Sequence, residues 1–322
     1  MADRNKKKVI DLKPGDTAEG YFYIKVSEQK QTTTNNRYMN FTFADNTGEI
    51  NAKLWDWDDD NVTRFAAGTV VWAKGQVIDW QGQLQFKIDR IRRTVEADNV
   101  NPEDFIPSAP YPGEEMYEIV EKTVLEMKNA EIATLVMAVL EKYKNQLIYF
   151  PAAKKNHHSV RCGLLYHITT MLKNAKALSD TYDFLNRDLL YAGVILHDIG
   201  KIEEMEVSEY GIVSDYTTEG IMLGHLIQGI KVVSETGKEL GINKEIIMLL
   251  EHMILSHHYE PEYGSPKYPM IPEAEMLHYL DVMDARMYDM ARAYETTETG
   301  TFSERIWSLN NRQIYRHDIK KE

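Results

Sequence analysis

Hydrophobic and polar residues alternate in short runs over residues 1–95. Five of these runs are rich in β-branched and aromatic side chains, and they predict strands over 19–26, 37–43, 49–55, 70–79 and 83–91. Clusters of turn-forming residues separate the runs, as at 33–36, 45–48 and 81–82. Five short strands in this order are typical of an OB-fold-like barrel, and a small β-sandwich is the alternative.

The hydrophobic pattern changes to a helical period after a proline-rich break. We interpret residues 96–113, which contain four prolines, as a semi-rigid linker between two domains. One helix face then collects Ile132, Leu135, Val136, Val139, Leu140 and Tyr143. Further helices are expected at 115–128, 160–180, 186–199, 219–237, 243–257 and 272–295. The sequence therefore predicts an all-α bundle of about seven helices over 114–300, followed by a C-terminal tail over 301–322.

Charge is unevenly distributed along the 322 residues, whose net charge is −13. Residues 1–95 carry 15 Lys and Arg and 13 Asp and Glu, so this segment is nearly neutral and can meet a polyanion. The remainder carries 22 basic and 37 acidic residues. The sequence has one cysteine, Cys162, and no apolar run long enough to cross a bilayer or to act as a secretory signal. We expect a cytoplasmic protein that does not engage a membrane.

Ligand-type residues gather in the helical part, which holds nine of the ten histidines, while His317 lies in the tail. The strongest local signal is His197-Asp198, which ends an apolar run, and Gly200 is expected to stop that helix. Adjacent side chains diverge by about 100° on a helix, so a metal would need ligands from other helices. Each candidate lies in or beside an apolar helical run: His167, His225, His257, His258 and Asp281.

The chemistry of this set favours a divalent transition metal. A single histidine on an apolar helix is more often a hydrogen-bonded core residue, so the hypothesis depends on the set as a whole. Histidine and carboxylate together suit Mn²⁺, Fe²⁺, Co²⁺ or Zn²⁺ better than Mg²⁺ alone. A divalent ion held by such a set can activate a water molecule, so the residues by themselves predict a metal-dependent hydrolase.

The order of these residues resembles that of the HD-domain metal-dependent phosphohydrolases over residues 115–300. The resemblance implies a basic metal set of His167, His197, Asp198 and Asp281. It also implies that a second metal is supported by His225, His257 and His258. Asp198 would then bridge two ions that bind phosphodiester oxygens and activate a water molecule, as in a phosphohydrolase. It favours Asp281 over Asp284, which could instead hold a histidine tautomer. Lys201 is implied to contact the substrate phosphate or to assist the leaving group; a lysine stabilised by a helix C-terminus is the alternative.

The predicted barrel suggests that a nucleic acid is delivered to the hydrolase. OB folds stack bases on aromatic side chains and follow phosphates with basic ones. The candidates for nucleic-acid contact are Tyr21, Tyr23, Tyr38, Phe41, Lys53 and Trp72. About half of the aromatic residues in so small a barrel must form its core. In the second part, His157 and His158 are candidates either for the metal site or for RNA phosphates.

The whole arrangement resembles the YhaM family of bacterial 3′→5′ exoribonucleases. The motifs that carry the resemblance are NHHSVRCGLLYHI, HDIGK, SHHYEPEYGSPK and TFSERIWSLNNRQIYR. Cys162 departs from the small, glycine-like residue expected at its position. The resemblance implies hydrolysis of single-stranded RNA from the 3′ end with two metal ions, Mn²⁺ before Co²⁺, Fe²⁺ or Zn²⁺. Single-stranded DNA is a further candidate substrate.

Two other functions fit the same residues. One is an HD-type phosphohydrolase of a small nucleotide or cyclic dinucleotide, with the barrel as a regulatory domain. The other is a non-enzymatic nucleic-acid-binding protein with a structural metal, against which the size of the ligand set argues. Met and Tyr residues over 283–294 suggest a homo-oligomer interface or, alternatively, helix core.

Overall fold

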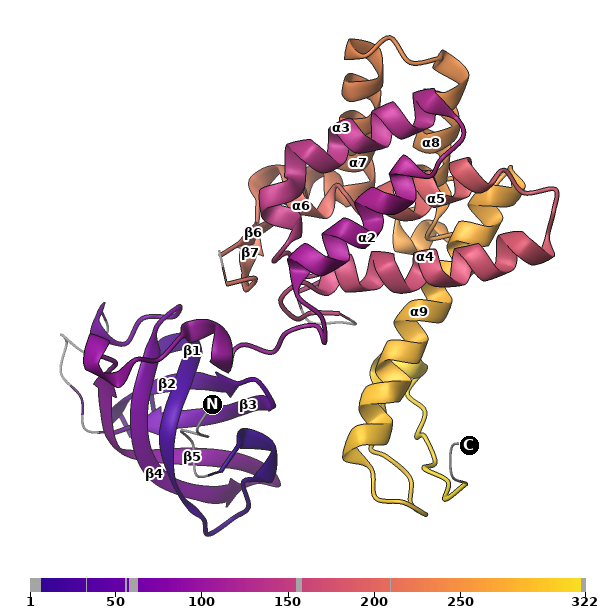
Figure 1. Ribbon diagram of the computed structural model, residues 1–322. Helices are drawn as coiled ribbons and strands as arrows, with labels where there is room; N and C mark the ends of the chain where they lie inside the picture. The colour runs from indigo at the N-terminus through magenta and orange to yellow at the C-terminus, as the bar shows by residue number, and fades with distance from the viewer. Residues whose placement is uncertain are drawn as a thin grey trace. The chain divides into compact units, whose positions relative to one another are not determined.

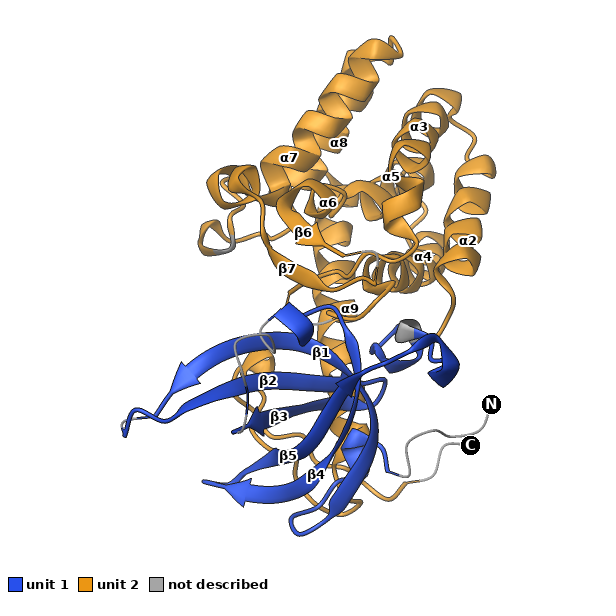
Figure 2. Ribbon diagram, turned by 90° about the vertical axis from the view of Figure 1, so that its left-hand side faces the viewer, with its two compact units in different colours: residues 1–108 blue, residues 109–322 orange. Residues whose placement is uncertain are grey.

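The chain forms two compact units, residues 1–108 and residues 109–322 (Figure 2). The structure is a computed structural model, and it describes residues 7–32, 34–55, 57, 63–154, 158–208 and 210–319. The division between the units lies inside the segment that we interpreted as a linker.

Unit 1 is a closed five-stranded barrel, which confirms the prediction of an OB-fold-like domain (Figure 1). Its strands follow the order β1-β2-β3-β5-β4, and β3 and β5 run parallel while the other neighbours are antiparallel. The strands are β1 (Thr17–Gln31), β2 (Arg37–Asp45), β3 (Gly48–Leu54), β4 (Val70–Trp80) and β5 (Gln83–Arg93).

Stacked aromatic rings fill the barrel. Phe22 lies 5.3 Å from Phe43 and 5.6 Å from Phe86 between ring centroids, and Phe41 lies 5.5 Å from Phe43. Successive residues of a strand point to opposite faces, and most of these side chains alternate with less buried ones, although Tyr23 and Ala44, next to Phe22 and Phe43, are buried as well. Gly75 permits the closure of the barrel, since a Cβ there would lie 2.1 Å from the carbonyl oxygen of Lys87.

Residues 96–106 pack on the barrel. They include two 3₁₀ helices, Glu96–Asp98 and Pro102–Phe105. Phe105 and Ile106 are buried, and Asp98 accepts hydrogen bonds from Tyr21 Oη and from the guanidinium of Arg92. The first part of the expected linker therefore belongs to unit 1.

Unit 2 is a helical bundle, as the 3.6-residue period predicted. Its described helices are α2 (Gly113–Leu125), α3 (Ala130–Leu147), α4 (Gly163–Thr181), α5 (Arg187–Leu196), α6 (Lys201–Glu204), α7 (Thr218–Glu239), α8 (Lys244–Ser256) and α9 (Pro272–Thr296). α5 is the most enclosed of them, because every residue from Leu189 to Leu196 is buried. Its N-terminal end at Arg187 is exposed, whereas its C-terminal end at His197 is buried in the bundle.

Two smaller features were not expected. A short hairpin, β6 (Met205–Val207) and β7 (Val213–Tyr216), joins α6 to α7. The C-terminal tail turns back beside α9 (Figure 1), where Leu309 is buried and the guanidinium of Arg316 donates to the carbonyl oxygen of Thr297. Among the described residues, no helix combines the length and the apolar character that crossing a bilayer requires.

Candidate metal centre

Two helices end with their last turn aimed at the same point in the bundle. His197 caps the C-terminus of α5 and is followed by Asp198, while His257 caps the C-terminus of α8 and is followed by His258. In each case Nδ1 of the capping histidine faces a carbonyl oxygen three residues back, at 2.8 Å from Val194 and 2.9 Å from Ile254. A carbonyl only accepts, so Nδ1 carries the hydrogen and Nε2 keeps a free lone pair.

α4 and α9 bring a third histidine and two carboxylates to this point. Nε2 of His167 lies 3.3 Å from Nε2 of His197 and 3.3 Å from Oδ1 of Asp281. Nδ1 of His167 lies 2.7 Å from Oδ2 of Asp284. Asp284 is therefore one layer outside the cluster and orients the ring of His167, the role that the sequence left open for it.

Asp198 lies at the middle of the cluster. Its Oδ2 is 3.3 Å from Nε2 of His197 and 2.6 Å from Nζ of Lys201. Its Oδ1 faces the other half of the site, at 3.5 Å from Nε2 of His225 and 3.9 Å from Nε2 of His257. The carboxylate thus spans two groups of histidines.

A break in α7 positions His225. Gly224 interrupts the helix with φ 69° and ψ 165°, a backbone conformation essentially restricted to glycine. Directly after this break, the backbone N–H of His225 donates to Oε1 of Glu204 at 3.1 Å, and Nδ1 of the ring lies 3.3 Å from the same oxygen. Glu204 therefore fixes both the backbone and the ring, and no spacing signal in the sequence singled it out.

The donor atoms form overlapping groups that suit a cation. His167, His197 and Asp198 bring one ligand atom each within 4.8 Å of one another, as do His197, His257 and Asp281, and His225, His257 and His258. Three of these buried atoms have no hydrogen-bond partner among the described residues: Asp198 Oδ1, His225 Nε2 and His257 Nε2. Buried polar atoms normally have a hydrogen-bond partner. Converging lone-pair atoms without one are therefore suited to coordinate divalent cations.

The charge states of His257, Asp198 and Lys201 also suit a metal site. Burial holds the pKa of His257 well below its usual range, and the neighbouring His258 adds to this effect, so the ring is neutral. Burial alone would raise the pKa of Asp198, but Lys201 and His197 hold it well below the usual range. Burial likewise opposes the charge on Lys201, yet Asp198 raises its pKa. The site therefore presents an ionised carboxylate and a cationic lysine.

Gly200 has a different role from the one that the sequence suggested. Its φ is −63°, so it is not a left-handed helix stop. A Cβ at Gly200 would instead lie 2.0 Å from the carbonyl oxygen of His225 and 2.5 Å from the backbone nitrogen of Gly229. The glycine is needed because α7 passes against it, and this contact holds His225 over Asp198.

His158 lies behind the metal cluster. It is 1% exposed, its Nε2 lies 2.8 Å from Oδ2 of Asp284, and its ring packs on Tyr288. The prediction that His158 contacts nucleic acid is wrong, because the side chain is buried. Gly163 permits this placement, since a Cβ there would lie 1.9 Å from the carbonyl oxygen of His158. His157 is outside the described residues.

Burial also corrects two of the barrel candidates. Tyr23 is 2% exposed and Phe41 is 0% exposed, so both belong to unit 1's interior and cannot stack on bases. Tyr21 and Trp72 are partly exposed, but Tyr21 is tied to Asp98 and the guanidinium of Arg92 lies over Trp72.

Tyr38 and Lys53 remain on the outer face of the barrel, where β2 and β3 pair. The Tyr38 ring lies 4.9 Å from that of Trp55, and Nζ of Lys53 lies 5.0 Å from the Tyr38 ring centre. On the same face Asn51 donates to Asn40 at 2.9 Å and accepts from Gln85 at 2.8 Å. We call these six residues the β2–β3 face; Tyr38 and Lys53 came from the sequence, whereas the amide series was missed.

Comparison with known proteins agrees with both units. Residues 164–286 match the HD domain, and residues 25–93 match the OB-fold nucleic acid binding domain. The 3′-5′ exoribonuclease YhaM of Bacillus velezensis is 43% identical over 303 residues, which cover 94% of this chain and 95% of that protein. The chain belongs to the YhaM family.

Two further members show the same extent of similarity. The YhaM exoribonuclease of Bacillus subtilis is 41% identical over 95% of this chain and 97% of its own length. That of Halalkalibacterium halodurans is 40% identical over 96% of this chain and 95% of its own length. The family predicted from the motifs is thereby confirmed, together with the barrel and the HD domain. The HD domain and the histidine–carboxylate clusters together indicate that this YhaM-family chain binds a divalent metal.

Proposed function

We propose that this protein is a metal-dependent 3′→5′ exoribonuclease that hydrolyses single-stranded RNA. Metal-dependent hydrolysis is supported by one observation: buried ligand atoms without hydrogen-bond partners, on His225, His257 and Asp198 itself, converge around Asp198. The direction and the substrate follow from membership of a family whose curated members are 3′-5′ exoribonucleases. Single-stranded DNA is a second substrate to be tested.

We infer two cation positions that share Asp198. The first would use Asp198 Oδ2 with His167, His197 and Asp281, and the second would use Asp198 Oδ1 with His225, His257 and His258. The separation of the two oxygens of Asp198 toward different histidine groups supports this division. Imidazole and carboxylate donors favour Mn²⁺ first, with Co²⁺, Fe²⁺ and Zn²⁺ as alternatives.

The chemistry needs a nucleophile and a way to offset charge on the phosphodiester. Bound divalent cations supply both, by lowering the pKa of a water molecule and by binding the phosphate oxygens. The protein's own part is to hold four rings with Nε2 facing inward, through carbonyl and carboxylate acceptors on Nδ1 of His167, His197, His225 and His257. Lys201, kept cationic beside Asp198, is suited to contact the phosphate or to stabilise the leaving oxygen.

The β2–β3 face is our candidate for binding the RNA strand. It offers a Tyr38–Trp55 ring pair for stacking, Lys53 for a phosphate, and amides that can meet base edges or sugar hydroxyls. Trp55 is 41% exposed, which leaves ring surface for a base.

Degradation of an end-labelled strand tests the proposal. The full-length protein with Mn²⁺ should shorten a 5′-labelled single-stranded RNA stepwise and release 5′-mononucleotides. Asp198→Ala should abolish cleavage, whereas Asp215→Ala, which removes an exposed carboxylate paired with Lys154, should not. Hydrolysis of nucleoside triphosphates or cyclic dinucleotides with the RNA left intact would contradict the proposal and favour a small-nucleotide phosphohydrolase.

A further inference from the structure

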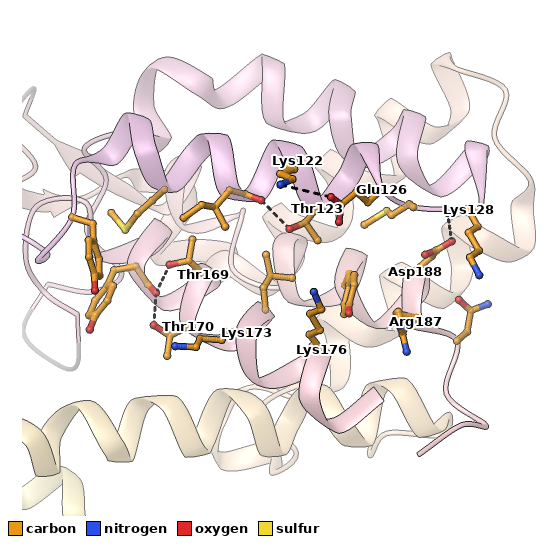
Figure 3. A pocket seen from close by; sticks show the side chains of 18 residues that line it. Lys122, Thr123, Glu126, Lys128, Thr169, Thr170, Lys173, Lys176, Arg187 and Asp188 are labelled. Carbon is orange, nitrogen blue, oxygen red and sulfur yellow. Dashed lines mark hydrogen bonds and ion pairs between the residues drawn. The ribbon is translucent and has the colours of Figure 1, made fainter. Parts of the chain in front are cut away.

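A groove separate from the metal cluster runs between α2 and α4 in unit 2 (Figure 3). Its volume is about 1210 Å³, and the beginning of α5 closes one end. The floor contains Met116, Leu172 and Tyr191, which are buried. On α4 the groove is lined by Tyr166, Thr169, Thr170, Lys173 and Lys176, whereas His167 faces the metal cluster. The helix therefore separates two differently built surfaces.

The groove is cationic although the chain is acidic. Five basic side chains line it: Lys122, Lys128, Lys173, Lys176 and Arg187. Only two acidic residues, Glu126 and Asp188, accompany them in that lining. Asp188 is already engaged, since it accepts from the backbone N–H groups of Lys128 and Asn129 at 2.8 and 2.7 Å. Of the cations, Arg187 pairs with Asp180 at 2.6 Å and Lys122 with Glu126 at 4.0 Å, which leaves Lys128, Lys173 and Lys176 as the main source of the excess charge. The excess of positive charge in a unit dominated by carboxylates makes this surface complementary to an anion.

Two helix N-termini add to the positive potential at the α5 end of the groove. α3 begins after Asn129, and α5 begins after Asn186, which lines the groove. The N-terminus of a helix carries a partial positive charge and favours anions. Lys128 and Arg187 lie at this same end, as Figure 3 shows.

Aromatic side chains occupy the other end. The Tyr111 ring, 58% exposed, lies 6.2 Å from that of Tyr166, and Tyr166 in turn packs against His158 behind the metal cluster. From Tyr166 to Lys176 the α4 backbone advances by about 15 Å, at 1.5 Å per residue. Lys173 and Lys176 lie in the last third of this length, and Lys128 and Arg187 lie at the α5 end, so a polymer can reach the aromatic end and the cations together, whereas a compact anion cannot.

We propose that this groove, between α2 and α4, binds the phosphodiester backbone of single-stranded RNA as a second contact surface of the enzyme. The inference rests on the proposed function, because it takes RNA as the substrate. Phosphates lie along Lys122, Lys173 and Lys176 toward Lys128 and Arg187, and a base stacks on Tyr111. A cationic groove with an aromatic platform is the general arrangement for holding a single strand without sequence preference.

Neutralising two groove lysines tests the inference in the full-length protein. Lys173→Gln/Lys176→Gln removes two exposed charges from α4, and Lys238→Gln/Lys244→Gln removes two exposed lysine charges elsewhere in unit 2 as a matched control. Binding of a 5′-fluorescein single-stranded RNA is measured by anisotropy in EDTA, which keeps the strand intact, over a range of salt concentrations. Loss of two phosphate contacts should make the slope of log K against log salt about 1.4 less negative. It should also weaken binding about 25-fold at 0.1 M salt, by the same relation.

Mn²⁺-dependent hydrolysis of bis(p-nitrophenyl) phosphate separates this inference from the proposed function. The groove variant should keep wild-type rates with this small diester. If wild-type protein cleaves neither RNA nor the diester, the proposed function fails, and the anisotropy still decides whether the groove binds RNA.

Three results would overturn the groove proposal. The first is RNA binding by the groove variant equal to that of the control. The second is weaker RNA binding by the groove variant with an unchanged salt slope, which would mean that no phosphate contact had been lost. The third is a change of mass in light scattering with unchanged RNA binding, which would assign the groove to a protein partner.

Discussion

Asp284 offers the sharpest test of how the metal cluster is built. It does not belong to the inferred ligand set, yet its Oδ2 is 2.7 Å from Nδ1 of His167 and 2.8 Å from Nε2 of His158. Although burial alone would lower it, Asp281 and Asp284 raise the pKa of His167 to about 9, so this carboxylate makes the ring more basic. Asp284→Asn keeps the shape and removes the charge.

The expected size follows from the two hydrogen bonds. Hydrogen bonds to a charged group contribute about 1 kcal/mol more than neutral ones, so two of them amount to about 2 kcal/mol. Changing a residue that orients a metal-bound histidine typically costs about 10- to 100-fold in metal affinity. We therefore expect Mn²⁺ to bind Asp284→Asn about 10- to 100-fold more weakly, with His167 still in place.

Isothermal titration of Mn²⁺ into metal-free protein measures this change, and activity at saturating Mn²⁺ provides a second readout. Asp289→Asn is the matched control, because it makes the same substitution on the same helix at a partly exposed residue. Its Mn²⁺ affinity should equal that of the wild type. Equal affinities for wild type, Asp284→Asn and the control would refute the view that the His158–Asp284–His167 chain orients a metal ligand.

Three other predictions concern different parts of the structure. Gly200→Ala places a Cβ against the backbone of α7. It should lower the free energy of unfolding of unit 2 by about 1–3 kcal/mol, measured by chemical denaturation, and should lower the rate of RNA cleavage at least tenfold. Gly193→Ala meets only the flexible end of Met253 and should remain active; equal behaviour of the two variants would contradict the argument. Trp55→Ala should weaken single-stranded RNA binding by about 1–3 kcal/mol in anisotropy while sparing hydrolysis of bis(p-nitrophenyl) phosphate, and unchanged binding would remove the β2–β3 face from the RNA path. Mn²⁺ at 100 times its Kd should stabilise EDTA-treated protein by about 2.7 kcal/mol in thermal unfolding, and Asp198→Ala should lose this effect.

The secondary structure could be predicted because each unit follows one simple period. In the barrel, Phe41 and Phe86 alternate with less buried neighbours, and in α3 the buried side chains from Ile132 to Tyr143 repeat every three or four residues. The β6–β7 hairpin escaped prediction because its strands span only three and four residues, too few for a period to appear. The buried tail residue Leu309 escaped it for a related reason, since its partner surface on α9 is distant in sequence.

The metal candidates could be identified from residue type and order, and the supporting Asp284 from its place one helical turn after Asp281, but the supporting Glu204 could not. Glu204 acts through hydrogen bonds to His225, 21 residues away, and nothing local distinguishes it from a solvated carboxylate. Predictions of base-stacking aromatic residues were wrong where the sequence did not show which face of the strand was inside. Tyr38 and Phe41 are both aromatic residues of β2, but their spacing of three positions places them on opposite faces. The role predicted for Gly200, a helix stop, was wrong, because a single sequence does not show which helices pack closely against each other.

An acidic chain that binds RNA poses a charge problem that the metal cluster resolves locally. Among the inferred ligands only Asp198 and Asp281 are carboxylates, and the other five are histidines, which ligate as neutral rings. Two divalent cations would bring four positive charges and Lys201 a fifth, against these two carboxylates and two more, Glu204 and Asp284, which contact the histidines from outside. The filled site would therefore be net positive by one charge within a chain of net charge −13. A histidine-rich ligand set thus does more than hold a metal, because replacing those rings with carboxylates would retain the ions but cancel the attraction for a phosphodiester.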